Sequence, residues 1–433
     1  MSLYDKMGLL ITPNGVAPSK IFAYKPTNGS GDGVFDRNTT ATRVNSVGLI
    51  EEVAIDMARI DYPTNGSCPH LLFEPQSTNL VAYSEDFTDS SYIKTRLSIT
   101  SDVILSPDGT LNGSKVVENT QLSTRRLYTN SNIIVSGKSY TLSIFAKKSE
   151  RDTFNLVFGN NGFAGVEASF DLENGTTNLI SGDSSLIENY GNGWYKCSLT
   201  GTSDANGSDK MSIYMTNPIN NRSYQGDGIS GFYLFGYQLE ALPYPTSYIP
   251  TNGSAVTRVK DVANNFGDVN TFNSEEGVLF VEMAALSNDL TSREISISDG
   301  TTANRIELRY SSVSNRIQAL IRVSGSIQSN MTFVASDITL FSKIALKYKA
   351  NDFSLYVDGS EVSTDSSGSV FPLSVLNVLS FNQGDGGNVF LGKVKQVQVY
   401  KEALTDLELE YLTTYATFPD LANANNYNLI LDI

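Results

Sequence analysis

The sequence predicts an all-β protein made of tandem β-sandwiches, with a single short helix near its C-terminal end. The 433 residues include 22 Tyr, 21 Phe and 34 Gly, and only 18% are charged. Many aromatic residues, many turn formers and little charge favour strands joined by tight turns over helices. Strand-like runs recur at spacings typical of sandwiches, for example at 139–146, 231–237 and 353–357. The last of these runs ends in Asp358-Gly359, a pair that favours a hairpin turn.

One segment has the signature of a helix start. In Thr405-Asp406-Leu407-Glu408, the Thr405 side chain can accept a hydrogen bond from the Glu408 amide while the Glu408 side chain reaches back. Leu409 and Leu412 continue an apolar side. The pattern predicts a helix near 406–416 that docks on a sheet.

Short repeated phrases suggest where the chain divides. Pro-Thr-Asn-Gly-Ser begins at Pro26, Pro63 and Pro250, and each copy predicts a turn. The phrases Ala-Thr-Arg-Val at 41–44 and Ala-Val-Thr-Arg-Val at 255–259 follow the first and third copies and predict structural joints. Phrases this short also arise by chance in a biased composition.

Three units follow from these boundaries: a turn-rich segment at 1–80, a sandwich at 81–258, and a second sandwich with the helix at 259–433. The short strands of residues 1–80 cannot bury much surface alone. We therefore expect this segment to depend on a partner chain or on self-association.

Charge argues against some classes of partner. The chain has 31 Lys and Arg residues against 46 Asp and Glu, a formal charge of -15. Such a surface repels phosphate backbones and anionic membranes, so no nucleic-acid binding is expected. No stretch reaches the roughly 18 apolar residues of a membrane span, so no membrane insertion is expected. The N-terminus lacks the basic and apolar regions of a secretion signal, which indicates synthesis in a cytoplasm.

The reactive residue types are few. Cys68 and Cys197 fall in different predicted units and are interpreted as free thiols. The single histidine, His70, lies beside Pro69, where a packed or exposed loop residue is more common than a catalyst. No run of closely spaced carboxylates resembles those that glycosidases place on one strand face. No catalytic residue is expected, and the chain is predicted not to be an enzyme, although pairs of carboxylates from distant strands cannot be recognised in a sequence.

Sugar binding is the chemistry that the composition favours. Aromatic rings stack on the apolar face of a pyranose while Asn, Asp and Gln side chains align its hydroxyl groups. Trp194, in Gly-Trp-Tyr at the start of a strand, is expected to pack the end of a core. The candidate ligand-binding aromatics are Tyr190, Tyr214, Tyr224 and Tyr310.

A metal site has one candidate. Asn382, Asp385 and Asn388 offer hard oxygens from one loop, which suits Ca²⁺. The Gly-Asp-Gly-Gly within that loop is equally typical of a plain hairpin turn. No other cofactor is expected.

Two sets of phrases resemble bacteriophage proteins. Phe-Asp-Arg-Asn-Thr-Thr-Ala-Thr-Arg-Val-Asn at 35–45 and Leu-Leu-Phe-Glu-Pro-Gln-Ser-Thr-Asn-Leu at 71–80 resemble the N-terminal region of tailed-bacteriophage virion proteins. Gly-Asn-Gly-Trp-Tyr-Lys-Cys at 191–197 and Gly-Tyr-Gln-Leu-Glu at 236–240 are similar to the carbohydrate-binding-module-like jelly rolls of the same proteins.

A third set resembles the laminin-G-like, concanavalin-type lectin sandwich. It comprises Ile-Ala-Leu-Lys-Tyr at 344–348, Leu-Tyr-Val-Asp-Gly at 355–359 and the strand at 392–400. The chain departs from that pattern at Phe341, where a Trp is usual, and at Gln396, where an acidic residue is common. The loss of the acid weakens any calcium or ligand site carried over from the family.

Together the resemblances imply a non-enzymatic structural protein of a phage virion. It would be assembled in the host cytoplasm, sit on the tail or capsid surface and contact host surface polysaccharide as a fibre-like adhesin. They imply attachment to other virion proteins through residues 1–80 and a homo-oligomer, with a trimer preferred by analogy with phage fibres. Two alternatives remain: a decoration protein whose lectin-like folds bind no sugar, and, less favoured, a glycan-active enzyme with a binding module.

Overall fold

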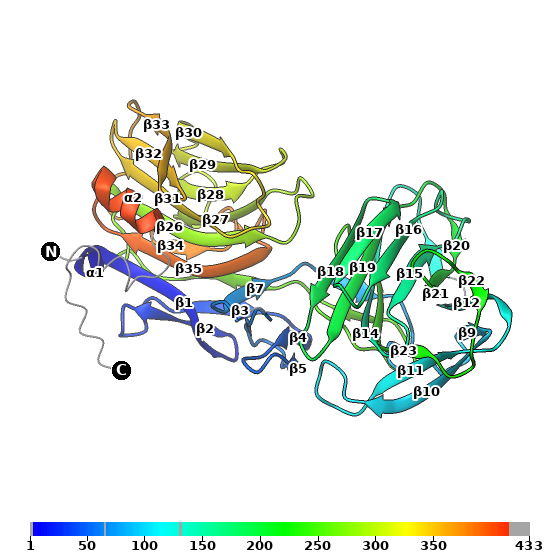
Figure 1. Cartoon of the computed structure of the whole chain (residues 1–433). Helices are drawn as coiled ribbons and strands as arrows, with labels where there is room; N and C mark the ends of the chain where they lie inside the picture. The colour runs from blue at the N-terminus through cyan, green and yellow to red at the C-terminus, as the bar shows by residue number, and fades with distance from the viewer. Residues whose placement is uncertain (1–2, 65, 130–131, 415–433) are drawn as a thin grey trace.

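A computed structural model describes residues 3–64, 66–129 and 132–414, and in these residues the prediction of an all-β protein is confirmed. Figure 1 shows two β-sandwiches joined by the N-terminal strands. The described helices are α1 (Leu3–Lys6) and α2 (Asp406–Thr414). Neither has the length and apolar character that a bilayer-spanning helix needs.

The first sandwich packs a six-stranded sheet against a seven-stranded sheet. Its core lies between them and includes Ile144 and Leu199 from one sheet and Phe154 and Ile213 from the other. Alternate residues of each strand point inward, as the two-residue period of a strand requires. The six-stranded order is β10 (Leu97–Ile104), β11 (Gly113–Glu118), β23 (Gly231–Glu240), β14 (Ser139–Lys148), β19 (Trp194–Thr202) and β18 (Ser184–Asn189). The seven-stranded sheet contains β17 (Thr176–Ser181), β16 (Glu167–Asp171), β15 (Thr153–Phe158), β21 (Met211–Met215), β12 (Leu122–Thr129) and β22 (Ser223–Gln225), with β9 (Tyr92–Thr95) also pairing with β12, and β13 (Asn132–Ile134) pairs separately with β20 (Gly207–Asp209).

The second sandwich packs a five-stranded sheet against an eleven-stranded one. Ile295 and Leu308 of the smaller sheet meet Leu279 and Leu346 of the larger sheet in its core. The five-stranded order is β30 (Ser326–Val334), β29 (Arg316–Val323), β28 (Arg305–Tyr310), β27 (Arg293–Ser298) and β34 (Val378–Ser380). The eleven-stranded order is β25 (Val262–Asn264), β3 (Gly33–Asp36), β2 (Lys20–Lys25), β1 (Met7–Ala17), β35 (Gly392–Tyr400), β26 (Glu276–Ala285), β31 (Ser342–Lys349), β32 (Phe353–Val357) and β33 (Ser360–Asp365), while β7 (His70–Phe73) pairs with β35 and with β6 (Arg59–Asp61).

The N-terminal segment is built into this second sandwich. Strand β1 lies beside β35, with Leu9 opposite Val399 and Ile11 opposite Val397. Leu9 and Ile11 are fully buried in the core of the C-terminal sandwich. The expectation that the strands of residues 1–80 need a partner chain to bury their surface is therefore corrected, because a strand about 390 positions away along the chain covers them. Figure 1 shows these blue strands lying along the orange β35.

Two further short pairings tie the segment to the first sandwich. Ile50, in the hairpin of β4 and β5, packs with Phe145, Trp194 and Tyr248 on the outer face of the six-stranded sheet. Trp194 is buried and its indole Nε1 donates to Leu105 O at 3.0 Å, so the structure confirms its packing role. The paired strands are β4 (Ala41–Val44) with β5 (Ile50–Val53), and β8 (Ser77–Asn79) with β24 (Val256–Arg258).

Helix α2 covers the outer face of the eleven-stranded sheet. Its Leu409 and Leu412 share a buried cluster with Ala345 of β31 and Tyr356 of β32. The predicted capping box is present: Thr405 N donates to Glu408 Oε2 at 2.9 Å and Glu408 N donates to Thr405 Oγ1 at 3.3 Å. The predicted helix is confirmed as far as residue 414, and residues 415–416 lie outside the described part of the chain.

The histidine and the cysteines have different environments. His70 is not in a loop but opens strand β7, where its side chain is buried. Cys68 is exposed and Cys197 lies in the core of the first sandwich, and both are free thiols. Burial raises the pKa of the Cys197 thiol well above its usual value, which makes it unreactive.

Candidate glycan-binding face

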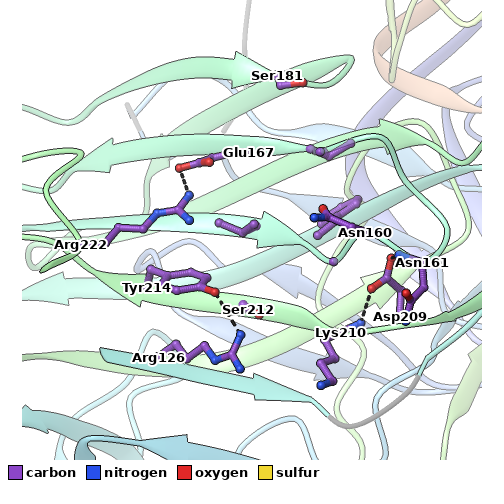
Figure 2. Close-up of a pocket in the computed structure, with 15 residues that line it drawn as sticks. Arg126, Asn160, Asn161, Glu167, Ser181, Asp209, Lys210, Ser212, Tyr214 and Arg222 are labelled. Atoms are coloured by element: carbon purple, nitrogen blue, oxygen red, sulfur yellow. Dashed lines mark hydrogen bonds and ion pairs between the residues drawn. The ribbon is translucent and has the colours of Figure 1, made fainter. Parts of the chain in front are cut away.

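The seven-stranded sheet carries a cavity on its outer face. Along β21, Met211, Ile213 and Met215 point into the core, so Ser212 and Tyr214 point outward. The register places Arg126 of β12 on one side of Tyr214 and Asn155 of β15 on the other. The cavity has a volume of about 460 Å³. Figure 2 shows Tyr214 between Arg222 and Glu167 above it and Arg126 below it.

Tyr214 lies between two guanidinium groups. Arg126 Nη1 donates to Tyr214 Oη at 3.1 Å, and Arg126 Cζ lies 5.9 Å from the centre of the ring. Arg222, from the segment between β21 and β22, has its Cζ 4.4 Å from the same centre. These contacts combine an aromatic surface with several N–H donors, a set suited to a sugar ring and its hydroxyl groups.

One wall of the cavity is an ion pair. Arg222 Nη2 pairs with Glu167 Oε1, and Asn155 Nδ2 donates to the same carboxylate oxygen. Glu167 belongs to β16, where the register sets it opposite Val157. The ion pair holds Arg222 across the strands and over Tyr214, as Figure 2 shows.

The opposite wall is a loop fastened by Asp209. The Asp209 carboxylate is 1% exposed, and it accepts backbone hydrogen bonds from Asn161 at 3.1 Å, Gly162 at 3.0 Å and Lys210 at 2.8 Å. A Cβ added to Gly159 would lie 1.8 Å from Asp209 Oδ1, so the close approach of loop and carboxylate requires glycine there. This loop places Asn160 and Asn161 at the rim of the cavity.

The four candidate tyrosines do not form one site. Tyr214 lines the cavity on the sheet, and Tyr190 lines a different cavity, where it meets Phe145 edge to face at a centroid distance of 4.9 Å. The prediction that Tyr224 and Tyr310 are ligand-binding aromatics is corrected, because these residues are only 6% and 1% exposed. The Tyr224 hydroxyl donates to Glu118 Oε2 at 2.6 Å and the Tyr310 hydroxyl donates to Met283 O at 3.1 Å, so both satisfy their polar ends inside the fold.

The cavity residues that the sequence does not single out are mainly cations. Arg126, Lys210 and Arg222 line the cavity but attract no notice in the sequence, since each looks like an ordinary surface charge. The signal was the alternation of polar residues in β12 and β21, where Arg126 and Tyr128 or Ser212 and Tyr214 occupy alternate positions. Only the pairing of these two strands shows that the polar positions share a face.

The second cavity lies where the N-terminal segment meets both sandwiches, and its volume is about 710 Å³. His70, Asp61 and Phe341 line it from the side of the second sandwich. His70 Nε2 lies 3.5 Å from Asp61 Oδ2, and its ring meets Phe341 at a centroid distance of 5.7 Å. Burial, together with the charges of Lys393 and Lys395, lowers the pKa of His70 to about 3, so the imidazole is neutral at physiological pH. Burial raises the pKa of Asp61 to about 6.

The proposed metal loop uses its oxygens to hold its own shape. Asn382 Oδ1 accepts from the backbone N–H groups of Gly384 at 2.7 Å and Gly386 at 3.3 Å, and Asp385 Oδ1 accepts from Gly387 N at 2.9 Å. The Asn388 side chain donates to Glu294 Oε1 at 3.0 Å. Among the described residues, no three His, Cys, Asp or Glu side chains gather in a way that could hold a metal ion. Calcium binding by this loop therefore stays a prediction.

A close pair of carboxylates, Glu294 and Glu307, lies beside that loop on strands β27 and β28. Arg309 Nη1 is 3.0 Å from Glu294 Oε1 and 3.2 Å from Glu307 Oε1, so it bridges the pair. Arg305 Nε also pairs with Glu307. Both carboxylates are fully buried, and neither lines one of the two cavities described above. In this conformation a glycosidic bond cannot reach them. Burial, reinforced by the charge of Glu294, raises the pKa of Glu307 to about 7.

This raised pKa makes stability depend on pH. Between about pH 4.5 and pH 7, the folded chain keeps a proton on Glu307 that the unfolded chain has released, so the free energy of unfolding falls as pH rises through that window. Glu307→Gln mimics the protonated form and removes the loss, which is on the order of 3 kcal/mol. Urea unfolding at pH 5, 6, 7 and 8 should show that the free energy of unfolding of the variant increases relative to that of the parent chain as pH rises. The exposed Glu410→Gln serves as control, and a difference between Glu307→Gln and the parent that stays constant with pH would contradict the assignment.

Comparison with known proteins agrees with the architecture of the second sandwich. Residues 281–410 match the family described as the Concanavalin A-like lectin/glucanases superfamily. No curated protein matches the sequence. The matched range begins within β26 and ends within α2, so it omits the N-terminal strands that the structure adds to the same sheet.

Solved structures similar to parts of the chain include lectins and binding modules. The CBM40 of the Ruminococcus gnavus IT-sialidase, bound to α2,3-sialyllactose, is 21% identical over 32% of this chain and 83% of its own, with a TM-score of 0.28. The SAP-like pentraxin of Limulus polyphemus is 13% identical over 34% and 73%, with a TM-score of 0.28. Domains LG4-5 of the mouse laminin α1 chain are 10% identical over 67% and 91%, with a TM-score of 0.24. The chain is thus an all-β protein whose C-terminal sandwich is concanavalin-like over the matched residues 281–410.

Proposed function

We propose that this chain is a non-enzymatic glycan-binding protein and that the outer face of the seven-stranded sheet is its binding surface. The observation that carries the proposal is the cavity on this face, which is lined by the Tyr214 ring, the guanidinium groups of Arg126 and Arg222 that contact it, and Asn160 and Asn161. Of the residues lining this cavity, the two acids, Glu167 and Asp209, are both engaged in holding its walls. The arrangement favours binding over acid–base chemistry, which needs a free carboxylate beside the bond to be broken.

The setting that we propose is the surface of a phage particle, on the tail or the capsid. The resemblance of residues 35–45 and 71–80 to virion proteins supports it. In this account the chain assembles in the host cytoplasm as a homotrimer and attaches to other virion proteins through residues 1–80. Several weak sites in one oligomer would then give avidity without a strong single site. Phe22, Tyr24 and Val34 are exposed apolar side chains on the segment that such a partner could cover.

The experiment that tests the function is a glycan array probed with the full chain, followed by calorimetric titration of the strongest oligosaccharide. We expect Tyr214→Ala to weaken binding about tenfold, because an aromatic contact contributes about 1 kcal/mol beyond its burial. Tyr24→Ala removes a half-exposed tyrosine from β2 and should leave the affinity unchanged. Thermal unfolding of both variants would check that each remains folded.

Two results would overturn the proposal. A chain that binds no glycan on the array would be better described as a decoration protein with lectin-like folds. Binding that survives Tyr214→Ala unchanged would move the site away from the sheet face, and the junction cavity that contains Tyr190 would be tested next.

A further inference from the structure

We propose that the ligand of the sheet face is an acidic oligosaccharide, and that Arg126 and Lys210 bind its carboxylate or phosphate group. The inference rests on the proposed glycan-binding function and names the class of sugar. It follows from the balance of charges around the cavity, where three cations and two acids line the walls: Arg126, Lys210, Arg222, Glu167 and Asp209.

Two of these cations have no carboxylate partner among the residues that the structure describes. Arg222 pairs with Glu167, and the Asp209 carboxylate accepts from the backbone N–H groups of Asn161, Gly162 and Lys210. Within the described ranges, neither Arg126 nor Lys210 forms an ion pair, although the chain as a whole has a formal charge of -15. In a protein with such an excess of acids, two unpaired cations on the wall of one cavity are a feature that a solubility role does not explain.

The two cations contact the same aromatic ring. Arg126 Cζ lies 4.3 Å and Lys210 Nζ lies 5.2 Å from the centre of the Tyr128 ring. Their separation therefore cannot exceed the sum of these two distances, which is within the roughly 10 Å over which charges interact at 0.1 M salt. Like charges at this range repel each other, and a bound anion removes that repulsion while accepting hydrogen bonds from both groups.

The contacts around Tyr128 also set the geometry of the ligand. Arg126 touches both aromatic rings, since it lies over Tyr128 and donates to Tyr214 Oη. An anionic group held by Arg126 and Lys210 would thus place the adjoining sugar ring next to Tyr214. A planar guanidinium binds a carboxylate or phosphate through two parallel hydrogen bonds, which a neutral hydroxyl cannot match.

The net charge of the chain narrows the class of acidic oligosaccharide further. The rest of the acidic surface repels a densely charged polymer, so the fitting ligand carries isolated anionic residues separated by neutral sugars. This description includes uronate-containing and phosphate-substituted oligosaccharides, and it excludes nucleic acid.

The test compares matched glycan pairs with the full chain. A trisaccharide with one glucuronate between two neutral sugars is set beside its carboxyl-reduced form, in which that residue is glucose, and a mannose-6-phosphate-bearing disaccharide is set beside its dephosphorylated form. We expect the acidic member of at least one pair to bind about tenfold more tightly, and its affinity to fall as NaCl rises from 50 to 500 mM. The pair that shows the preference identifies the carboxylate or the phosphate as the preferred group.

Variants then assign the preference to the two cations. Lys210→Gln should abolish most of the preference for the acidic sugar while leaving the weaker binding of the neutral sugar in place. Arg126→Gln should abolish the same preference and also weaken the binding of the neutral sugar, because Arg126 contacts Tyr214. Lys138→Gln removes an exposed cation in a turn of the same sandwich, away from the cavity. This control should change neither the preference for the acidic sugar nor the binding of the neutral sugar.

The outcomes separate this inference from the proposed function. Equal binding of acidic and neutral sugars would overturn the acidic-ligand inference and leave glycan binding intact. A preference that survives both substitutions would overturn the role of Arg126 and Lys210. Loss of all glycan binding by the parent chain would overturn the proposed function and this inference together.

Discussion

Asp261→Ala is expected to destabilise the protein by about 3–5 kcal/mol, because it leaves two buried guanidinium groups without their shared carboxylate. Asp261, Arg37 and Arg59 are all fully buried. Arg37 Nη1 lies 3.1 Å from Asp261 Oδ1, Arg59 Nη2 pairs with Asp261 Oδ2, and Glu74 N donates to the same Oδ2 at 2.7 Å. Removing one partner of a buried ion pair costs far more than the pair contributes, since the remaining charge stays out of water.

Asp261 completes a network of buried ion pairs and hydrogen bonds. This network joins the N-terminal segment to the end of the first sandwich and to β24. Glu74 pairs with Arg59 and also with Arg258 at 2.8 Å, and the Ser247 hydroxyl donates to Glu74 Oε2 at 2.7 Å. Arg59 and Glu74 come from the N-terminal segment, Ser247 from the end of the first sandwich and Arg258 from β24. The nearby cations hold the pKa of Glu74 well below its usual range in spite of its burial. The loss at Asp261 should therefore loosen the junction between the sandwiches as well as the local packing.

Urea unfolding at neutral pH measures the loss. The control is Glu51→Ala, which removes the partner of Arg43 in a partly exposed pair and should cost at most about 1 kcal/mol. Asp261→Asn keeps the shape of the side chain, and its loss of stability should lie between those of Asp261→Ala and Glu51→Ala. If Asp261→Ala fails to fold, the Asn variant still tests the network, and losses for Asp261→Asn no larger than those of the control would contradict it.

Deleting residues 1–25 is expected to abolish the cooperative unfolding of the C-terminal sandwich and to cause aggregation. The deletion removes β1 and β2 from the interior of the eleven-stranded sheet and takes Leu9, Ile11 and Ile21 out of the core. Strand β35 then presents an unpaired edge along Gln398 and Val399, and such an apolar edge is a template for association between chains. The minimal C-terminal domain should accordingly include these N-terminal strands and not begin at residue 259.

Light scattering and calorimetry of the truncated chain provide the measurement. The control is a chain that carries Phe22→Ser and Tyr24→Ser, two exposed positions on β2, which should keep its fold and its mass. Supplying residues 1–80 as a separate polypeptide should recover solubility if β1 pairs with β35. A truncated chain that stays soluble and unfolds cooperatively would contradict the prediction that the C-terminal sandwich needs residues 1–25. A full-length trimer that falls to soluble monomers on truncation would show instead that the segment serves self-association.

Features that depend on neighbouring residues could be predicted from the sequence. The alternating aromatic runs and the Asp-Gly turn predict strands and hairpins, because strand period and turn backbone are local properties. The capping box at 405–408 predicts the start of α2 for the same reason, since both of its hydrogen bonds join residues three apart. Trp194 could be assigned a packing role because Gly-Trp-Tyr opens a strand, and the structure buries it.

The candidate site depended on tertiary structure. The sequence shows that Tyr190, Tyr214, Tyr224 and Tyr310 are aromatic, but the side of the sheet on which each ring lies is decided by strand register, and a shift of one residue reverses it. Tyr224 and Tyr310 turned inward, while Tyr214 met Arg126 only because β12 pairs with β21. Arg43 and Arg258 occupy equivalent positions in similar phrases, yet one is partly exposed and the other is buried against Glu74.

The sequence by itself determined the class of this protein: strands, tight turns, one capped helix and an acidic surface, all of which follow from residue types and short-range spacing. Tertiary structure alone decided that β1 completes a sheet whose neighbouring strand lies at the other end of the chain, and that two unpaired cations share one aromatic ring. The physical reason is that pairing partners separated by hundreds of residues are selected by the burial of whole sheet faces, an energy that no local pattern contains.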